Sequence, residues 1–145
     1  MTFSRNVTLD WQGSIMEGSG DVKAGTGAFS LPVSFPRRIG DPQGQTSPEE
    51  LIAAAHAVCF AMVINAATGK KGGSIEKTHV TCTVTADKSD AGIKITTSKL
   101  VVTVEGLKGI EASAFDAHAK EAEKGCPVSN ALRGNVDIQV EGSAK

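Results

Sequence analysis

The amino-acid sequence predicts an α+β fold, and three features of the chain lead to this prediction. Short runs with a period of two residues open the sequence, one strong helix signal follows them, and further alternating runs flank two shorter helical segments. The resulting order β-β-β-α-β-β-α-α-β does not suit a doubly wound parallel sheet, in which strands and helices alternate. With 145 residues and a mass of 14.9 kDa, residues 1–145 are expected to form a single domain.

The first 36 residues are expected to form an antiparallel meander of short strands. Residues 7–12 and 29–35 alternate between apolar and polar side chains, and glycines separate these runs. A middle strand is expected near residues 21–24. Pro32 has no backbone N–H to donate, so its strand should lie at the edge of the sheet.

The clearest helix signal in the chain starts at Ser47. Ser47 is a good N-cap, Pro48 occupies the first helical position, and Glu50 completes a capping box. The helix should continue from Leu51 to about Thr68 and stop at Gly69. Its body is apolar on every face, which is typical of a helix buried on all sides. Because so short a chain has few elements to surround it, we expect this helix to pack against its own copy in a partner chain.

A long hairpin is expected in the second half of the chain. Its strands cover residues 75–86 and 93–105, and the turn lies at residues 88–92. The apolar residues of the second strand change phase along its length, which predicts a bulge near Thr97. The remaining predicted elements are two helices and a last strand, near residues 111–124, 126–134 and 136–140.

Composition and charge exclude several classes of function. Fifteen Lys and Arg against 16 Asp and Glu give a net charge of −1, which offers no electrostatic attraction for nucleic acid or an anionic membrane. The N-terminal residues lack the apolar region of a signal peptide. The longest nearly apolar run, residues 51–64, falls short of the about 20 residues that span a bilayer. We therefore expect a soluble, cytoplasmic protein.

Three cysteines cannot all pair within one chain, so we expect a reducing compartment and no disulfide framework. Cys82 lies on the apolar face of a strand and is expected to be a small buried hydrophobe. Cys126 lies at a helix start, where free N–H groups and the helix dipole favour a thiolate. A simple capping role would also account for it. From these residues alone, Cys126 would be chosen as the nucleophile.

Cys59 lies in the middle of a helix, far from the N-terminal end of the dipole. Burial alone would raise the pKa of its thiol and make it inert. To be reactive it needs a nearby cation, which His56, one turn earlier, or Arg37 or Arg38, from the loop at residues 36–45, could supply. A metal site formed by His56, Cys59 and Cys126 ranks low, because no paired-cysteine spacing supports it.

Three stretches of sequence together carry a family resemblance. They are residues 46–51 (Thr-Ser-Pro-Glu-Glu-Leu), 55–62 (Ala-His-Ala-Val-Cys-Phe-Ala-Met) and 125–129 (Gly-Cys-Pro-Val-Ser). The chain resembles the OsmC/Ohr family of thiol peroxidases over essentially its whole length, and its motifs resemble the OsmC (osmotically inducible protein C) branch. The resemblance implies an OsmC-like fold in which antiparallel sheets wrap around two central helices in an intertwined homodimer.

The resemblance also implies roles for individual residues. Cys59 would be the peroxidatic cysteine and Cys126 the resolving one. Arg38 would activate Cys59, with Arg37 as an alternative, and Glu49 would orient the arginine. Ten residues of helix rise about 15 Å, so Glu49 cannot sit beside Cys59 of its own chain. We therefore expect a site shared between two chains.

The implied activity is a peroxidase that reduces organic hydroperoxides, and hydrogen peroxide less well, in defence against oxidative or osmotic stress. Cys59 would become a sulfenic acid, Cys126 would condense with it to a disulfide, and an external dithiol would restore both thiols. A lipoyl group is one candidate for that dithiol. No metal, flavin or haem is required. We expect the apolar surroundings that favour organic substrates to include Phe60, Met62, Ile39 and Phe35.

Two other classes of function remain open from the sequence. A redox sensor would use the same cysteines without turnover, and a small-molecule or metal-binding stress protein would bind its ligand stoichiometrically. Turnover of an organic hydroperoxide with a dithiol would separate the enzyme from both alternatives, and zinc analysis would identify the metal-binding protein.

Overall fold

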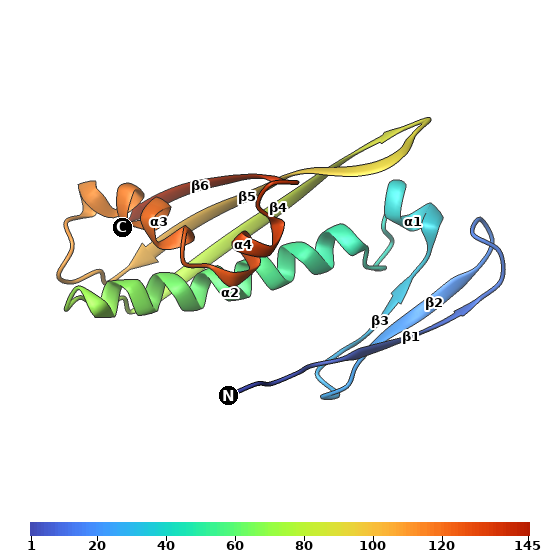
Figure 1. Cartoon of the computed structure of the whole chain (residues 1–145), viewed down its shortest axis with the longest axis horizontal. Coiled ribbons are helices and arrows are strands. Elements are labelled where there is room, and N and C mark those ends of the chain that lie inside the picture. The colour runs from blue at the N-terminus through green and yellow to red at the C-terminus, as the bar shows by residue number, and fades with distance from the viewer. The chain divides into compact units, whose positions relative to one another are not determined.

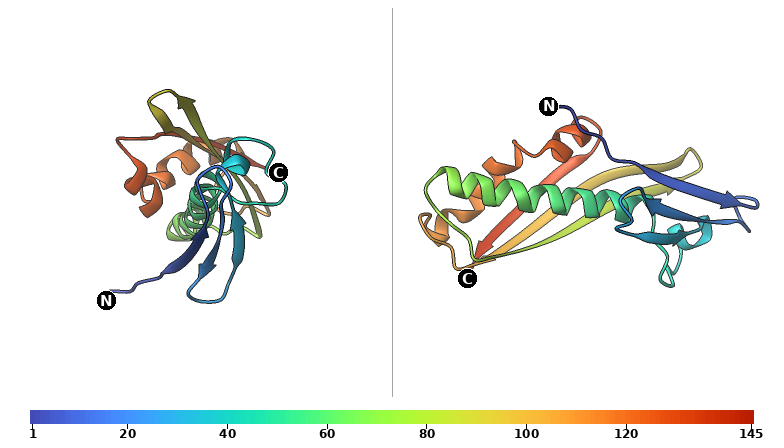
Figure 2. Two further views of the ribbon diagram at one scale, coloured as in Figure 1. Left: turned by 90° about the vertical axis from the view of Figure 1, so that its right-hand side faces the viewer. Right: turned by 90° about the horizontal axis from the view of Figure 1, so that it is seen from below.

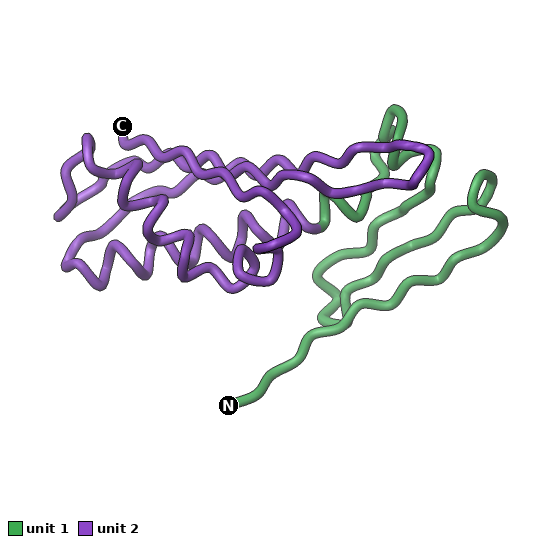
Figure 3. Tube along the Cα trace, turned by 45° about the horizontal axis from the view of Figure 1, so that its top comes forward, with its two compact units in different colours: residues 1–51 green, residues 52–145 purple.

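A computed structural model describes all 145 residues, which divide into two compact units at residues 1–51 and 52–145 (Figure 3). Figure 1 labels the elements along the chain. The first unit contains strands β1 (Val7–Gln12), β2 (Ser19–Ala24) and β3 (Ser30–Val33), the short helix α1 (Phe35–Ile39) and the start of helix α2 (Pro48–Lys70). The second contains the rest of α2, followed by β4 (Lys77–Ser89), β5 (Gly92–Glu105), a 3-10 turn (Ala112–Ala114), α3 (Phe115–Glu123), α4 (Pro127–Leu132) and β6 (Asp137–Ala144).

The first unit is the predicted antiparallel meander, with strand order β1-β2-β3. Val22 of the middle strand lies opposite Leu9 on one side and Leu31 on the other, and it is the one buried apolar side chain of this sheet. Pro32 lies in the edge strand β3, as its missing N–H predicted. At Gly20 an added Cβ would come within 2.6 Å of the Asp10 carbonyl oxygen, so the close approach of β1 and β2 requires glycine there.

The segment expected to be a loop at residues 36–45 begins with helix α1, and the preceding strand ends at Val33, two residues before Phe35. The Arg38 N–H donates to the Ser34 carbonyl and the Gly40 N–H to the Pro36 carbonyl, both at 3.1 Å. Pro36 lies in the first turn, where its missing N–H costs no hydrogen bond. A helix of five residues is too short to show a 3.6-residue period, which is why the sequence pattern did not reveal it.

Helix α2 starts as predicted, with half of the expected capping box. The Glu50 N–H donates to the Ser47 hydroxyl at 3.1 Å, but the Glu50 carboxylate accepts from the Thr46 hydroxyl and does not return to the Ser47 backbone. The helix runs to Lys70, slightly beyond the predicted end, and the chain leaves it through Gly72 at φ +76°. A left-handed residue at this point suits glycine.

Within the single chain, α2 is buried on one face only. The buried side chains follow one another at four-residue steps and are His56, Phe60, Ile64 and Thr68. On another face, Val58 and Met62 are 57% and 68% exposed. By length and apolar composition α2 could also cross a membrane, but a core helix of a soluble protein passes the same test, and its buried face packs into the core of the second unit.

The second sheet has the order β4-β5-β6 (Figures 1 and 2). Strands β4 and β5 form the predicted hairpin, and the register shifts where Thr85 faces Thr97 and Ala86 faces Ile95. Thr96 is therefore the extra residue of the bulge, one position from the prediction. Strand β6 pairs with β5 in parallel, so this sheet is mixed, whereas antiparallel sheets were expected. A parallel neighbour needs a crossover, and α3 and α4 form it.

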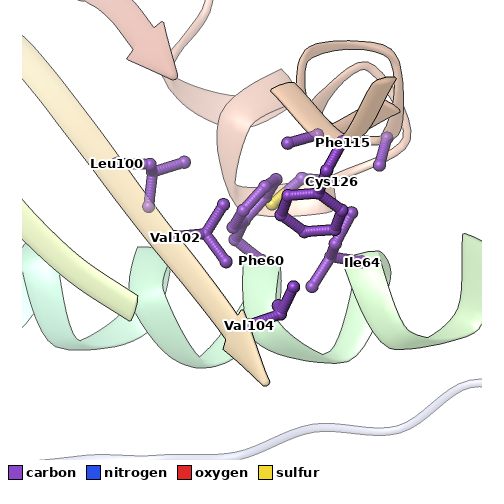
Figure 4. Close-up of a cluster of buried hydrophobic side chains, with 9 residues drawn as sticks. Phe60, Ile64, Leu100, Val102, Val104, Phe115 and Cys126 are labelled. Atoms are coloured by element: carbon purple, nitrogen blue, oxygen red, sulfur yellow. The ribbon is translucent and has the colours of Figure 1, made fainter. Parts of the chain in front are cut away.

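The apolar core of the second unit lies between its sheet and its helices (Figure 4). Alternate residues of β5 point at the helices because successive strand side chains face opposite sides. They meet the buried face of α2 and the apolar face of α3, and the Cys126 sulfur lies among them. The fully buried apolar side chains are Phe60, Ile64, Leu100, Val102, Val104, Phe115, Ala119 and Cys126.

Candidate active site

Cys59 and Cys126 meet in the second unit, although 67 residues separate them in the sequence. The Cys126 thiol donates to the Cys59 sulfur across 3.3 Å, and both cysteines are free thiols. Cys126 is buried at the N-cap of α4, and Cys59 is half-buried on α2. A disulfide bond needs about 2.05 Å between its sulfurs, so these atoms must approach by about 1.3 Å more.

The surroundings of Cys59 within its own unit oppose ionisation. Burial raises the pKa of the Cys59 thiol, and the neighbouring Cys126 adds to this effect. One group acts in the opposite direction, because a hydrogen bond from the Val128 backbone N–H stabilises the thiolate and lowers the pKa. From the sequence, the free amides at this helix start were expected to act on Cys126. In the structure the Val128 amide acts on Cys59 instead.

His56 lies one turn before Cys59, but it is not the cation that Cys59 needs. Its Nδ1 atom lies 2.7 Å from the Ser98 hydroxyl and its Nε2 atom 2.7 Å from the Ser129 hydroxyl. The ring is fully buried, and burial lowers the pKa of His56 although Glu123 partly offsets this. The imidazole is therefore a neutral bridge between β5 and α4, and both of its nitrogens are used.

Arg38 and Glu49 form an ion pair in the first unit. The Arg38 Nη2 atom lies 2.6 Å from Oε1 of Glu49, and its Nε atom lies 3.1 and 3.2 Å from the two carboxylate oxygens. The hydrogen bond from Arg38 lowers the pKa of Glu49, and the same bond raises the pKa of Arg38. Arg37 instead donates to the Asp41 carbonyl at 3.3 Å.

The predicted site residues thus fall into two pairs, each within one unit. Cys59 is with Cys126, and Arg38 is with Glu49. No group of three or more His, Cys, Asp or Glu side chains is arranged to hold a metal ion. The metal set of His56 with the two cysteines is not assembled, because both histidine nitrogens already bond to serines.

Two other expectations concern the surroundings of the thiols. Cys82 was expected to be buried; it packs against the apolar core but is only partly buried, and its sulfur lies 3.4 Å from the Ser98 hydroxyl. Burial raises the pKa of Cys82, so it is a poor nucleophile. Phe60 was expected to line the surface that meets substrate, but it is fully buried in the core and points away from solvent. Met62 and Ile39 are exposed.

Sequence reasoning missed the serines and the amide that organise this site. Ser98 interrupts the apolar phase of β5, where Leu100, Val102 and Val104 follow it at two-residue steps. A buried hydroxyl in such a row requires a partner, and this signal was readable from the sequence. The role of Ser129 was not readable in that way, because it depends on how α4 packs against α2.

The sequence of this chain is similar to that of known proteins. A family model described as OsmC-like protein matches residues 40–141. The peroxiredoxin OsmC of Escherichia coli (strain K12) is 37% identical over 142 residues, which cover 97% of this chain and 98% of the relative. The organic hydroperoxide resistance protein OhrA of Bacillus subtilis (strain 168) is 32% identical over 129 residues, which cover 84% and 86% of the two chains.

Solved structures show the same fold. The organic hydroperoxide resistance protein OhrB of Bacillus subtilis matches with a TM-score of 0.76 and 26% identity, over 97% of this chain and 98% of that one. The organic hydroperoxide resistance protein OsmC of Legionella pneumophila matches with a TM-score of 0.70 and 28% identity, over 95% and 96% of the two chains.

Proposed function

This chain belongs to the OsmC/Ohr family and acts as a thiol-dependent peroxidase in hydroperoxide defence, and from that premise we propose how its residues carry out the reaction. Cys59 is the peroxidatic cysteine and Cys126 the resolving cysteine. The observation that supports this assignment is the 3.3 Å approach of their sulfurs, together with the Val128 amide directed at Cys59. No cofactor takes part in the proposed cycle.

The proposed reaction has three balanced steps. The Cys59 thiolate attacks the distal peroxide oxygen, the O–O bond breaks, and the alcohol leaves with a proton, so that sulfur is oxidised to a sulfenic acid. The Cys126 thiol then forms an S–S bond with it while the S–O bond breaks, and the hydroxyl leaves as water with the thiol proton. An external dithiol, for which a lipoyl group is a candidate, finally reduces the disulfide by exchange and is itself oxidised to a disulfide.

Cys59 needs a cation to be a thiolate, and we assign that role to Arg38, oriented by Glu49. Glu49 and Cys59 lie ten residues apart on α2, and ten residues of α-helix rise about 15 Å. The proposal is therefore that Arg38 and Glu49 serve Cys59 of a partner chain. Arg37 is the alternative, but its guanidinium bonds to the Asp41 carbonyl and does not hold a carboxylate.

A homodimer is part of this proposal. The face of α2 that contains Val58 and Met62 is apolar and open in the single chain, and Leu9 and Trp11 of the first sheet are also exposed. Burying these side chains against a second copy would remove apolar area from water. In this view residues 1–145 form one OsmC-like domain that is completed by its partner. An odd number of cysteines fits a reducing compartment, so we propose a cytoplasmic location as well.

Mixed dimers test the shared site directly. A Cys59→Ser chain and an Arg38→Met chain are each expected to be inactive alone with tert-butyl hydroperoxide and a dithiol. In a heterodimer of the two, the Cys59 of one chain meets the Arg38 of the other, so about half of the sites should recover. An inactive heterodimer of intact fold would overturn the shared site. A wild-type protein that is oxidised once but never turns over would be a sensor and not the proposed enzyme.

A further inference from the structure

Helix α4, which presents Cys126, has few attachments to the rest of its unit. It contains six residues, and the side chain of its N-cap residue, Cys126, does not cap the free amides of the helix. So short a helix has little stability of its own, because nucleation is costly and few bonds follow it. Near its end Arg133 pairs with Glu123 at 2.7 Å, and in its first turn the Ser129 hydroxyl lies 2.7 Å from Nε2 of His56.

The His56–Ser129 bond ties together the two segments that carry the thiols. His56 lies three residues before Cys59 on α2, and Ser129 lies three residues after Cys126. Both groups are fully buried, so the bond is not exchanged for water. The other ring nitrogen of His56 is fixed by the buried Ser98 hydroxyl of β5 at 2.7 Å, which holds the imidazole against the sheet.

We propose that His56 is a positioning residue for the disulfide-forming step, holding α4 through Ser129 so that the Cys126 thiol stays within reach of Cys59. This inference rests on the proposed function, because it assigns His56 a role between the two cysteines of that cycle. Both ring nitrogens of His56 bond to serine hydroxyls and neither bonds to a sulfur, so the first step with peroxide does not depend on them. The second step does depend on it, because condensation needs the two sulfurs to move together from an already close approach.

The two nitrogens of His56 allow the roles of its neighbours to be separated. The side-chain amide of glutamine can place a polar group near the position of Nε2, whereas asparagine can place one only near Nδ1. His56→Gln should therefore keep the contact with Ser129, and His56→Asn should lose it while keeping the contact with Ser98. If His56 only stabilised the fold, there would be no reason for His56→Asn to slow disulfide formation more than His56→Gln.

The chain also provides a matched control. Thr68 is buried on the same face of α2, twelve residues further along, and its hydroxyl lies 3.0 Å from Nε2 of His118 on α3. Thr68→Val removes a buried histidine–hydroxyl bond between α2 and another helix, as Ser129→Ala does. It leaves the attachment of α4 untouched, so it reports the general cost of losing such a bond.

The experiment is a single turnover of the reduced, full-length protein with one equivalent of tert-butyl hydroperoxide. Samples quenched over time are divided between a sulfenic-acid-specific probe, which follows the first step, and mass analysis of the Cys59–Cys126 disulfide, which follows the second. In His56→Ala, His56→Asn and Ser129→Ala we expect the first rate to stay within about twofold and the second to fall by about tenfold, or about 1.4 kcal/mol in the barrier. His56→Gln and Thr68→Val should form the disulfide at nearly the wild-type rate.

The outcomes separate this inference from the function on which it rests. If the wild-type protein forms neither the sulfenic acid nor the disulfide, the proposed function fails. If it forms both, and Ser129→Ala and the His56 variants condense as fast as wild type, or Thr68→Val slows condensation equally, the positioning role is overturned. Should His56→Ala not fold, as judged by circular dichroism, Ser129→Ala decides the question because it removes a single oxygen atom.

Discussion

Arg38 holds both carboxylate oxygens of Glu49, with its Nε atom 3.1 and 3.2 Å from them and its Nη2 atom 2.6 Å from Oε1. This arrangement fixes the plane of the guanidinium as well as its distance, which a lysine could not reproduce. The pair joins α1 to the first turn of α2, so the arginine has a defined direction before any partner or substrate arrives.

The ion pair predicts a pH dependence of stability. Arg38 lowers the pKa of Glu49 below its ordinary value of 4.5, so near that pH the folded state binds fewer protons than the unfolded state. The stabilisation is therefore present above pH 4.5 and is lost as the pH falls through the lower, folded-state value. The difference in unfolding free energy between wild type and Glu49→Gln should be largest at neutral pH and smaller at an acidic pH below 4.5.

Urea unfolding at the two pH values measures this difference. Glu121→Gln is the control, because the pKa of Glu121 is also lowered, by Lys124, but the pair is exposed to solvent and should contribute little at either pH. An equal effect of Glu49→Gln at both pH values would contradict the prediction.

Removal of Arg38 should change the reactivity of Cys59 in a particular direction. Burial raises the pKa of the Cys59 thiol, and in the proposed dimer the arginine opposes this shift. In Arg38→Met, alkylation of Cys59 at neutral pH should slow by about tenfold, and the gap to wild type should narrow as the pH rises, because the Cys59 thiol then ionises in both proteins. Iodoacetamide labelling with peptide mapping measures the rate at each cysteine. Alkylation of Cys126 that is faster than that of Cys59 in wild type would reverse the assignment of the nucleophile.

The three single cysteine variants should differ in how many equivalents of organic hydroperoxide they consume. Cys59→Ser should consume no organic hydroperoxide above background. Cys126→Ser should consume about one equivalent and then accumulate a sulfenic acid, because no thiol resolves it. Cys82→Ser should keep turning over, since Cys82 belongs to the core and not to the reacting pair. Stopped consumption in Cys82→Ser of intact fold would place this third cysteine in the cycle.

Oxidation should stabilise the protein against unfolding. The proposed disulfide would close a loop of 67 residues, which in the chain-entropy model is worth about 4 kcal/mol. Urea unfolding of the reduced protein and of protein treated with one equivalent of tert-butyl hydroperoxide should differ by about this amount. Cys126→Ser is the matched control and should show no such gain. A wild-type protein with the disulfide formed and no gain would mean that the oxidised state is strained.

Substitutions on the two faces of α2 should have different effects, one on stability and the other on dimerisation. Phe60→Ala removes a fully buried ring and should lower the unfolding free energy by about 3–5 kcal/mol. Met62 is 68% exposed in the single chain, so Met62→Lys should leave the fold intact and instead shift the protein from dimer to monomer. Sedimentation velocity measures the second effect. A Met62→Lys dimer of wild-type affinity would show that this face is not the interface.

Much of the fold could be predicted because its elements have strong local signals. Ser47 and Pro48 start α2 where expected, and Pro32 lies in an edge strand. The phase change before Leu100 revealed the bulge of the hairpin. The parallel pairing of β6 could not be predicted, because an alternating strand has the same pattern whichever way its neighbour runs.

The sequence named candidate site residues, and the structure brings Cys59 next to Cys126 and Arg38 next to Glu49, but their local chemistry could not be predicted. Local reasoning favoured Cys126 because free amides lie at a helix start, and only the family resemblance selected Cys59. In the structure the Val128 amide of this helix start acts on Cys59, 69 positions away in the sequence, and lowers the pKa of its thiol. His56 was noticed for its closeness to Cys59, but its bonds to Ser98 and Ser129 depend on tertiary packing.

Because β6 is the last element of the chain and pairs with β5, the second sheet is completed only at the end of synthesis. The ribosome delivers Cys59 long before the crossover that contains Cys126, and the crossover is anchored only when β6 joins the sheet. If the proposed roles hold, Cys59 is synthesised before its resolving thiol, and a peroxide that reached it then would carry it to an irreversible acid. The burial that raises the pKa of the Cys59 thiol belongs to the folded second unit, so it slows such oxidation only once β5, the crossover and β6 have packed against α2.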